Sequence, residues 1–333
     1  MQKVKPKKNT QEKLIVGIGS ALVDILVRES DGFLAQAGAK KGGMTLVDSA
    51  GTIENILKQT TQKTCIVPGG SACNTILGIG KLGGRARFVG KRGGDELGAL
   101  LEKALADNNV EPRLFMSPSA TGRVLSIITP DAQRSMFTFL GASAETKPEE
   151  ILAEQFKGAA LVHIEGYLLF NEKLIRAALD AAKKAGALVS LDLASYTVVE
   201  ASKNILEDLV RDYVDILIAN EDEARAFTGL LEEEKALEAL SQKATTAVVK
   251  VGKRGSYIAH KGKTTAIGIM GDGSAVDTTG AGDLWASGFL YGLVNGYPID
   301  KAGKIGAACG YEVCQVVGAQ IPEEGWRRIR KLL

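Results

Sequence analysis

Short apolar runs alternate with longer amphipathic segments along most of this chain. After residue 158, each apolar run is typical of a buried strand, and each following segment has the apolar spacing of a helix. The predicted strands are residues 160–164, 188–192 and 215–219, and the predicted helices are residues 171–185, 201–211 and 221–228. This alternation indicates right-handed βαβ units around a parallel sheet. The pattern therefore predicts an α/β fold.

A second pattern interrupts this rhythm in the first half of the chain. Residues 124–129 and 135–140 flank the short segment Pro130-Asp131-Ala132-Gln133, which indicates a β-hairpin. We expect one domain over residues 1–333, with a small β-rich lid formed by parts of residues 24–68 and 112–142. The other predicted elements are strands at 14–19, 65–67, 87–90, 246–251 and 256–260 and helices at 51–61, 72–82, 95–108, 284–294 and 301–317.

A glycine-rich loop precedes the most apolar of these helices. Asp277-Thr278-Thr279-Gly280-Ala281-Gly282-Asp283 leads into residues 284–294, which are apolar on every face and are therefore expected to be buried. The two glycines let successive N–H groups converge at the positive end of the helix dipole, which makes an anion hole. Amides beside a carboxylate suit phosphoryl transfer to an alcohol, because the carboxylate can accept the hydroxyl proton. The same pattern also fits a turn whose aspartate caps the helix.

Composition narrows the class of protein. The 333 residues are 45% hydrophobic and 24% charged, with a net charge of +2, which argues against a broad nucleic-acid footprint. No apolar run has the length of a membrane span, and no signal peptide is evident, so we expect a cytoplasmic protein. The four cysteines lack CxxC spacing, which suits a reducing cytosol. Only two histidines are present, too few for a His-rich metal site.

Three further segments place glycine or polar side chains where a strand ends. Gly69-Gly70-Ser71-Ala72-Cys73-Asn74 lies at a strand-to-helix junction, and Asn220-Glu221-Asp222-Glu223 follows the strand 215–219. Lys250-Val251-Gly252-Lys253-Arg254-Gly255 is a second glycine loop at a strand end. Ligands of open α/β sheets bind at this edge. Gly17-Ile18-Gly19 lacks the third glycine and the helix of a dinucleotide fingerprint, which argues against a nicotinamide-dependent oxidoreductase.

In this order, the segments resemble the PfkB/ribokinase family of small-molecule kinases. The resemblance extends from about Leu14 to about Pro322. It implies a ribokinase-like three-layer α/β/α fold with a mostly parallel central sheet. It also implies phosphoryl transfer from ATP, with Mg²⁺, to a hydroxyl of a small sugar or nucleoside. A lid would exclude water and so protect the reaction from hydrolysis.

The resemblance implies roles for individual residues. The catalytic set is Asp283 as general base with Gly280, Ala281 and Gly282 as the anion hole. The acceptor would contact Asp24, Gly70 and Asn74, and by a weaker match Glu165. The nucleotide and Mg²⁺ would contact Asn220, Glu223, Gly252, Gly255, Ala307 and Gly310, with Glu223 holding Mg²⁺ through water. Asp277 and Thr279 resemble the monovalent-cation site of potassium-activated members.

Several of these residues also fit structural roles. Asp24 fits a turn at a strand end, and Asn74 fits a helix cap. Asn220 and Glu223 fit a capping box. Glu165 fits a structural carboxylate as well as it fits a substrate contact. These alternatives stay open at the level of sequence.

The acceptor is the least constrained feature. Ribokinase-type members usually carry lysine after the front glycine pair, whereas Ser71 stands here. Lys41–Val47 and Arg134-Ser135-Met136-Phe137 look more like the adenosine-kinase-like branch, in which an arginine on the lid neutralises phosphates. Arg134 equally fits a solvated hairpin charge. Met44, Phe137 and Phe139 can form an apolar slot for a base, or can simply pack the lid.

This interpretation favours adenosine over a furanose sugar such as ribose, fructose or a fructose phosphate. A catalytically weak ligand-binding relative is the remaining alternative. We expect no nucleic-acid or membrane partner. The protein is expected to be a monomer or a homodimer paired through the edge strands of the lid, because an unpaired edge is a template for association.

Overall fold

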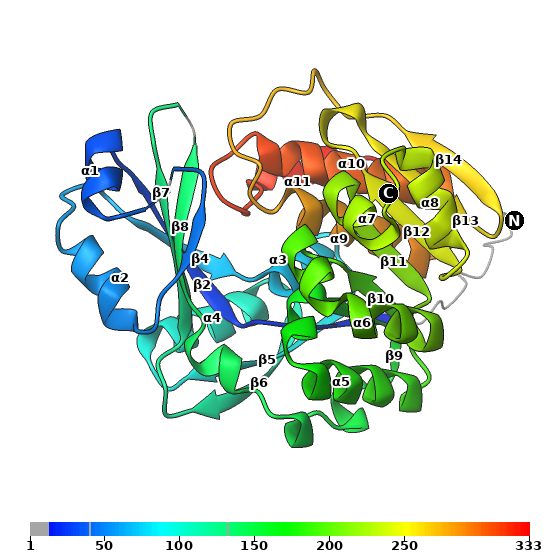
Figure 1. The fold of residues 1–333 in the computed structure, drawn as a ribbon, viewed down its shortest axis with the longest axis horizontal. Coiled ribbons are helices and arrows are strands. Elements are labelled where there is room, and N and C mark those ends of the chain that lie inside the picture. The colour runs from blue at the N-terminus through cyan, green and yellow to red at the C-terminus, as the bar shows by residue number, and fades with distance from the viewer. Residues whose placement is uncertain (1–12, 40, 132) are drawn as a thin grey trace, which may run out of the picture.

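Two β-sheets of unequal size organise the chain in a computed structural model, which describes residues 13–39, 41–131 and 133–333. The part of the predicted 1–333 domain that precedes residue 13 lies outside this description. Lys40 and Ala132, which belongs to the predicted hairpin turn, also lie outside it. Figure 1 shows the small sheet as a separate lobe beside the large one.

The large sheet has, within the described residues, nine strands in the order β14-β13-β12-β11-β10-β9-β1-β5-β6. The seven consecutive strands from β12 to the edge strand β6 run parallel to one another, and β13 is antiparallel to both β12 and β14. The strands are β1 (Leu14–Ile18), β5 (Ala86–Gly93), β6 (Val110–Ser117), β9 (Ala159–Glu165), β10 (Leu188–Asp192), β11 (Ile216–Asn220), β12 (Thr246–Lys250), β13 (Ser256–His260) and β14 (Lys263–Ile267).

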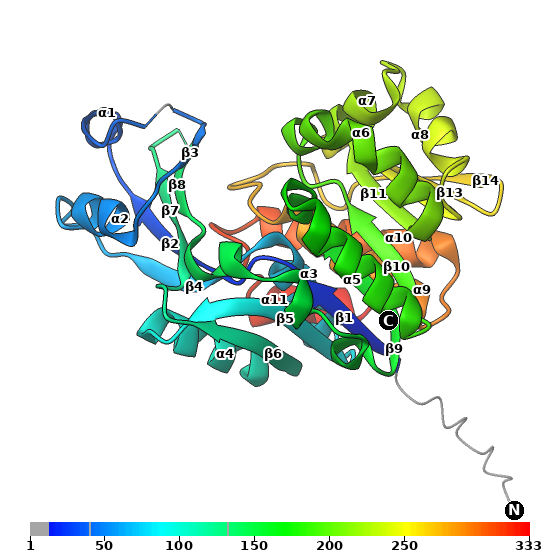
Figure 2. The same cartoon turned by 60° about the horizontal axis from the view of Figure 1, so that its bottom comes forward.

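Helices cover both faces of the large sheet, and Figure 2 shows the resulting layers. One face packs against α3 (Ser71–Lys81), α4 (Glu96–Asp107), α9 (Ala281–Val294) and α10 (Ile299–Cys314). The other packs against α5 (Glu172–Lys184), α6 (Tyr196–Tyr213), α7 (Glu221–Thr228) and α8 (Glu233–Ser241). The helix α11 (Glu323–Arg330) packs beside α10, and the short 3-10 helices are η1 (Gly141–Glu145), η2 (Pro148–Glu150), η3 (Ala153–Phe156), η4 (Gly166–Phe170) and η5 (Gly252–Arg254).

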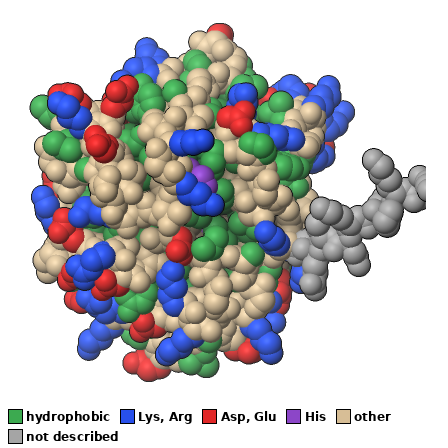
Figure 3. Space-filling model, turned by 90° about the vertical axis from the view of Figure 1, so that its right-hand side faces the viewer, with side chains coloured by type: hydrophobic (Ala, Val, Ile, Leu, Met, Phe, Trp, Pro, Cys, Tyr) green, Lys and Arg blue, Asp and Glu red, His purple; other side chains and the backbone are tan. Residues whose placement is uncertain are grey.

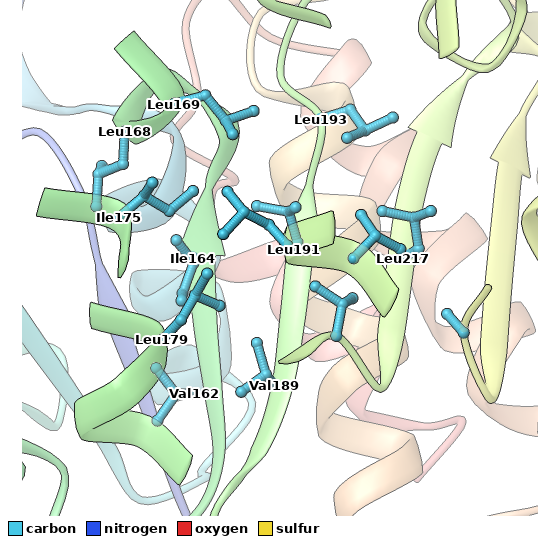
Figure 4. Close-up of a cluster of buried hydrophobic side chains, with 14 of the residues drawn as sticks. Val162, Ile164, Leu168, Leu169, Ile175, Leu179, Val189, Leu191, Leu193 and Leu217 are labelled. Carbon is cyan, nitrogen blue, oxygen red and sulfur yellow. The ribbon is translucent and has the colours of Figure 1, made fainter. Parts of the chain in front are cut away.

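Side chains alternate between the two faces of each strand, so each face of the large sheet contributes apolar side chains to the core. Val162 and Ile164 of β9 point toward Ile175 and Leu179 of α5, and all four are buried (Figure 4). Burying each such side chain contributes about 1.5–3 kcal/mol. The predicted α/β class with a mostly parallel central sheet is confirmed.

The small sheet has, among the described residues, five strands in the order β3-β8-β7-β2-β4. They are β2 (Leu22–Arg28), β3 (Met44–Leu46), β4 (Cys65–Gly69), β7 (Gly122–Ile128) and β8 (Arg134–Phe139). The predicted hairpin is confirmed as the antiparallel pair β7–β8. One face of the sheet is covered by α1 (Asp31–Gln36) and α2 (Ala50–Leu57). The strands overlap the two ranges from which a lid is predicted, although β2 begins two residues before 24 and β4 ends one residue after 68. Residues 110–117 instead form the edge strand β6 of the large sheet.

The last part of the chain differs from the prediction. The helix expected over 301–317 spans Ile299–Cys314, and α11 follows it unpredicted. Only Gly325, Trp326 and Ile329 of α11 are buried, so its apolar stripe is too short to stand out by spacing alone. Its proline at the N-cap and its acidic first turn were the available signal.

Charged groups of both signs are interspersed over the face shown in Figure 3. In the described part of the chain, no helix is long and apolar enough to cross a membrane.

His163 is a polar residue inside the large sheet. It lies on β9 and is completely buried, on the face opposite Val162 and Ile164. Its Nδ1 is 3.2 Å from Ser190 Oγ, and its Nε2 has no hydrogen-bond partner in the structure. Burial lowers the pKa of His163 to about 4, although the Asp192 carboxylate acts in the opposite direction.

We expect the wild-type protein to lose about 2 kcal/mol of unfolding free energy relative to a His163→Gln variant between pH 7 and pH 5. The folded-state pKa lies below the ordinary 6.5, so in this window the unfolded chain binds more protons and stability falls as the pH falls. Urea unfolding of both proteins at fixed pH steps measures the difference. The wild-type and variant proteins share the same cleft carboxylates, so these groups contribute equally to the pH dependence of both. A difference in unfolding free energy that is constant with pH would contradict the prediction.

Candidate active site

A cleft of about 970 Å³ lies between the two sheets. Its floor is formed where β9, β10, β11 and β12 end, because parallel strands deliver their carboxyl ends to the same edge. Its opposite wall is the uncovered face of the small sheet. The loop 278–283 closes the floor at the start of α9.

Gly280 gives the loop its shape. It is the N-cap of α9 with φ of 72°, a left-handed conformation that favours glycine, and a Cβ there would lie 2.6 Å from Ala319 Cβ. The Ala281 N–H donates to the Thr278 carbonyl oxygen at 3.1 Å. The predicted anion hole therefore depends on the next N–H groups of the first turn, those of Gly282 and Asp283, which have no acceptor within an α-helix.

Asp283 is held by α3. Its carboxylate accepts hydrogen bonds from Ser71 Oγ at 2.8 Å and from Asn74 Nδ2 at 3.0 Å. Desolvation raises the pKa of Asp283 to about 6, although these two hydrogen bonds act to lower it. Asn74 Oδ1 is buried without a hydrogen-bond partner, and Asn74 lines the cleft, so this oxygen is available to accept a hydrogen bond from a hydroxyl of a ligand.

Asp24 and the front glycines form the neighbouring wall. Asp24 lines the cleft from β2, and burial raises its pKa to about 7, with Arg134 acting to lower it. A Cβ at Gly69 would lie 2.3 Å from Asp24 Oδ1, and one at Gly70, where φ is 98°, would lie 2.3 Å from the Ser20 carbonyl oxygen. The glycine pair is therefore needed for the close approach of α3 to β2.

Glu165 joins two segments of the floor. Its Oε1 accepts from both the N–H and the hydroxyl of Ser20 at 2.7 Å, and its Oε2 accepts from the Ala72 N–H at 3.0 Å. Burial raises its pKa in spite of these donors. Because both oxygens already accept internal hydrogen bonds, Glu165 holds the turn before β2 against the start of α3. Glu165 also lines the cleft, so its contact with an acceptor stays a prediction beside this structural role.

Arg134 and Met44 line the cleft from the small sheet, but Phe137 and Phe139 do not. Phe137 is buried among the residues that contact α1 and α2, and Phe139 packs against the same cluster. Of the two alternatives that the sequence left open for these phenylalanines, the structure shows the packing of the small sheet and not the apolar slot. Strand alternation gives the reason, since residues 137 and 139 lie on the face opposite 136 and 138. Tyr167 and Phe170 of η4 line the cleft in their place.

Asn220 and Glu223 form the capping box at the start of α7. The Asn220 N–H and Nδ2 donate to the two oxygens of Glu223 at 2.8 and 2.7 Å, and the Glu223 N–H donates to Asn220 Oδ1 at 2.8 Å. Burial and the nearby Asp192 carboxylate raise the pKa of Glu223. Both residues line the cleft, so the structural role and a role in binding Mg²⁺ are compatible.

A buried ion pair completes the floor and was missed from the sequence. Lys250 Nζ, at the end of β12, lies 3.0 Å from Asp192 Oδ2, at the end of β10. Each residue closes an apolar strand at the ligand-binding edge, and that position was the available signal. Ser71 was also missed as a partner of Asp283.

A second cavity of about 350 Å³ opens on the other side of the 278–282 loop. It is lined by Gly252 and Gly255 of the second glycine loop and by Ala307 and Gly310 of α10. Five residues line both cavities: Asn220, Lys250, Thr278, Ala281 and Gly282. The structure thus brings the residues predicted for acceptor and nucleotide to two cavities that meet at one loop.

Asp277 and Thr279 lie at the base of this loop. Asp277 Oδ1 accepts from the Thr279 N–H and hydroxyl at 2.9 and 2.6 Å, and Oδ2 accepts from the Gly318 N–H at 2.8 Å. Burial acts to raise the pKa of Asp277, but these hydrogen bonds outweigh it and the pKa is lowered. The carboxylate fixes the loop against the segment after α10.

The family model described as pfkB family carbohydrate kinase matches residues 42–326, which include both glycine loops and the capping box. The chain belongs to the pfkB family of carbohydrate kinases. As a kinase of this family it uses ATP and a divalent metal ion.

Two solved structures are similar to this kinase over 97% of its chain and 100% of theirs, each at 30% sequence identity. They are a probable sugar kinase from Rhizobium etli CFN 42, with a TM-score of 0.88, and the adenosine kinase from Sinorhizobium meliloti, with a TM-score of 0.86. The 5-dehydro-2-deoxygluconokinase of Geobacillus thermodenitrificans (strain NG80-2) is 29% identical over 276 residues, 78% of this chain and 82% of the relative. The chain is therefore a sugar or nucleoside kinase.

Proposed function

We propose that this kinase phosphorylates a hydroxyl of a ribonucleoside, with adenosine as the first candidate. The observation that supports the proposal is the uneven chemistry of the larger cleft. Asp24, Asn74 and Asp283 supply polar groups at one end. Across the small sheet, β3 lies three strand spacings from β2, or about 14 Å, and lines the cleft with apolar side chains. A nucleoside has the same division between its ribose and its base.

The apolar end is exposed to an unusual degree. Phe170 is 66% exposed, Leu46 61% and Met44 52%, although all three line the cleft. Large apolar groups that are left uncovered beside polar ones mark a ligand site. A planar base between Phe170 and the β3 side chains would cover them. The similarity to an adenosine kinase at 30% identity supports this choice of acceptor.

The reaction follows from the groups at the loop. Asp283 accepts the proton of the acceptor hydroxyl as that oxygen forms its bond to the γ-phosphorus of ATP. The bond from the γ-phosphorus to the bridging oxygen breaks, and ADP leaves with the electron pair. The N–H groups of Gly282 and Asp283 stabilise charge on the transferred group. Asp24 and Asn74 Oδ1 orient the acceptor, and closure of the small sheet excludes water.

The metal ion in this proposal is Mg²⁺. Glu223 is buried beside the cavity junction with its pKa raised, so a cation there would stabilise its charged form. Among the described residues, no three His, Cys, Asp or Glu side chains converge as ligands of one ion. Glu223 would therefore hold Mg²⁺ through water, and the ion would supply neutralisation of phosphate charge. Activation by K⁺ near Asp277 and Thr279 is a separate proposal, tested by replacing K⁺ with Na⁺.

A furanose sugar is the second candidate acceptor. The probable sugar kinase is as similar in sequence as the adenosine kinase. The polar end of the cleft alone offers partners for sugar hydroxyls. A sugar would leave the apolar end uncovered, which is why we rank it second. A catalytically weak relative is the third alternative, and the presence of Asp283 and the glycine loop argues against it.

We propose a cytosolic monomer. The face of the small sheet away from the cleft is covered by α1 and α2 of the same chain, so a homodimer would have to pair through the edge strands β3 or β4. Cys73 and Cys309 are buried free thiols, which suits a reducing compartment. Light scattering on the purified protein measures its oligomeric state.

Asp283→Asn should lower kcat by at least about 10³-fold while the fold and nucleotide binding persist, because the substitution is isosteric but removes the base. Coupled ADP release measures turnover, and calorimetry measures nucleotide affinity. Asp300→Asn is the matched control, since Asp300 lies in the exposed first turn of the next helix, α10. Near wild-type turnover by Asp283→Asn would rule out Asp283 as the base.

The value of kcat/KM should fall tenfold per pH unit below about pH 6, because Asp283 accepts a proton only when ionised and its pKa is about 6. Ser71→Ala removes a hydrogen bond that lowers this pKa, so its acidic limb should move to higher pH. Steady-state profiles from pH 5 to 8 test both. Identical limbs in the two proteins would assign the titration to another group.

Phe170→Ala should raise KM for adenosine by about tenfold or more, because base–aromatic stacking contributes about 1–3 kcal/mol. KM for ATP should stay within about twofold. Tyr196→Ala is the control, since Tyr196 is exposed at the start of α6 and lines neither cavity. The assay panel includes other nucleosides, ribose, fructose and fructose phosphates. Turnover of a sugar alone, unaffected by Phe170→Ala, would replace the nucleoside by the second candidate.

A further inference from the structure

Lys250 occupies the junction of the two cavities. It lines both of them, at the carboxyl end of β12, and its side chain is only 15% exposed. A phosphoryl group that passes from a nucleotide in one cavity to an acceptor in the other must cross this junction. Asn220, Thr278, Ala281 and Gly282 share the position, and none of these four carries a positive charge.

The ammonium group lies directly beside the first turn of α9. A Cβ built on Gly282 would be 3.0 Å from Lys250 Nζ, so glycine leaves the space that the ammonium needs at that point. The Gly282 N–H is one of the two first-turn amides that have no acceptor within the helix, and Gly282 lines both cavities. An anion bound at these amides would therefore also contact the ammonium.

The charge of Lys250 is maintained by its surroundings. Burial disfavours an ammonium, but the carboxylates of Asp192 and Glu223 outweigh this effect, and the pKa of Lys250 is raised. Asp192 Oδ2 accepts the 3.0 Å ion pair, while Asp192 Oδ1 accepts from the Ala194 N–H at 3.0 Å. Asp192 is thereby fixed on β10 and orients the ammonium toward the loop.

We propose that Lys250, oriented by Asp192, binds the phosphoryl group during its transfer from ATP to the acceptor and neutralises its charge at the anion hole. The inference rests on the proposed kinase reaction but not on the identity of the acceptor. Lys250 stays protonated throughout. The hydroxyl oxygen bonds to the γ-phosphorus, its proton goes to Asp283, and ADP leaves with the electron pair of the broken bond. A single preorganised donor at such a position contributes about 10²- to 10³-fold to kcat.

A purely structural ion pair is the competing interpretation. Breaking a buried pair leaves one charge uncompensated and destabilises the fold, whether or not the pair acts on a ligand. A structural role would not distinguish ATP from ADP, because it places no charge near the terminal phosphate. Discrimination between the two nucleotides is therefore the decisive readout.

The first experiment compares Lys250→Met with wild type in binding ADP and a non-hydrolysable ATP analogue. Trp285 lines the nucleotide cavity, so its fluorescence reports both affinities. We expect Kd for the ATP analogue to rise about tenfold and Kd for ADP to change by less than about twofold. Lys183→Met is the control, because Lys183 forms a 2.7 Å ion pair with Asp215 at the opposite end of the strands. An equal rise in Kd for both nucleotides would overturn the proposal.

The second experiment separates chemistry from stability. Lys250→Met should lower kcat by about 10²-fold or more, and the charge-neutral double variant Lys250→Met/Asp192→Asn should recover thermal stability without recovering turnover. Asp192→Asn keeps an oxygen for the Ala194 N–H. Recovery of turnover together with stability would show a structural ion pair and overturn the proposal.

The same experiments distinguish a wrong role for Lys250 from a wrong choice of acceptor. Slow ATP hydrolysis without acceptor and the ATP-analogue affinity do not depend on adenosine. If adenosine is not phosphorylated but Lys250→Met still loses discrimination between the two nucleotides, the inference about Lys250 stands and the nucleoside assignment fails. If adenosine is phosphorylated normally by Lys250→Met, the inference about Lys250 fails alone.

Discussion

The contact between the start of α9 and the start of α3 holds the site together. Ser71 and Asn74 donate to Asp283 across 212 and 209 residues of sequence, and the Thr75 hydroxyl donates to the Asp283 carbonyl oxygen at 3.1 Å. These bonds fix a carboxylate on one helix by donors on another. Because α3 also begins at Gly70, which packs against the Ser20 carbonyl, the same contact sets the distance between the floor and β2. Moving either helix would displace Asp283, the proposed base, together with the residues proposed to contact the acceptor.

Several carboxyl groups are buried close together in this site, and burying their charged forms costs free energy. Asp24, Glu165, Glu223 and Asp283 are all shifted toward their neutral forms, in each case mainly by burial or desolvation. The positive charge of Arg134 opposes the rise in the pKa of Asp24, and that of Lys250 opposes the rise for Glu223 and Asp283. In the proposed reaction, the phosphates of ATP would enter a region rich in carboxyl groups, where the fixed N–H donors and the Lys250 ammonium would offset the added negative charge. Preorganisation of these donors on strand and helix ends means that they need little rearrangement during reaction.

The sequence predicts the strand ends and the glycine loops because these features are local. Asp283 and Asn74 could each be identified from their own motif, but their hydrogen bond could not, since it depends on how α3 and α9 pack. Asp192 and Lys250 each end an ordinary apolar strand. Their pairing requires the register of β10, β11 and β12, which no local pattern encodes. The two roles open to Phe137 could not be separated for a related reason, because period-two alternation distinguishes the two faces of a strand without saying which one meets a ligand.

The alternation of side chains along the strands of the small sheet gives its two faces different roles. Its inward positions on one face bury Ile25, Leu125 and Ile127 against α1 and α2, which gives the sheet a core of its own. Its other face lines the cleft, with Met44, Leu46 and Met136 on β3 and β8 and with Asp24 on the distant strand β2. An apolar surface left open beside charged groups loses hydrophobic stabilisation in the empty protein and regains it when a ligand covers it. Binding of an acceptor with an apolar part would therefore favour closure of the small sheet over the floor, so that exclusion of water and alignment with Asp283 follow from the same step.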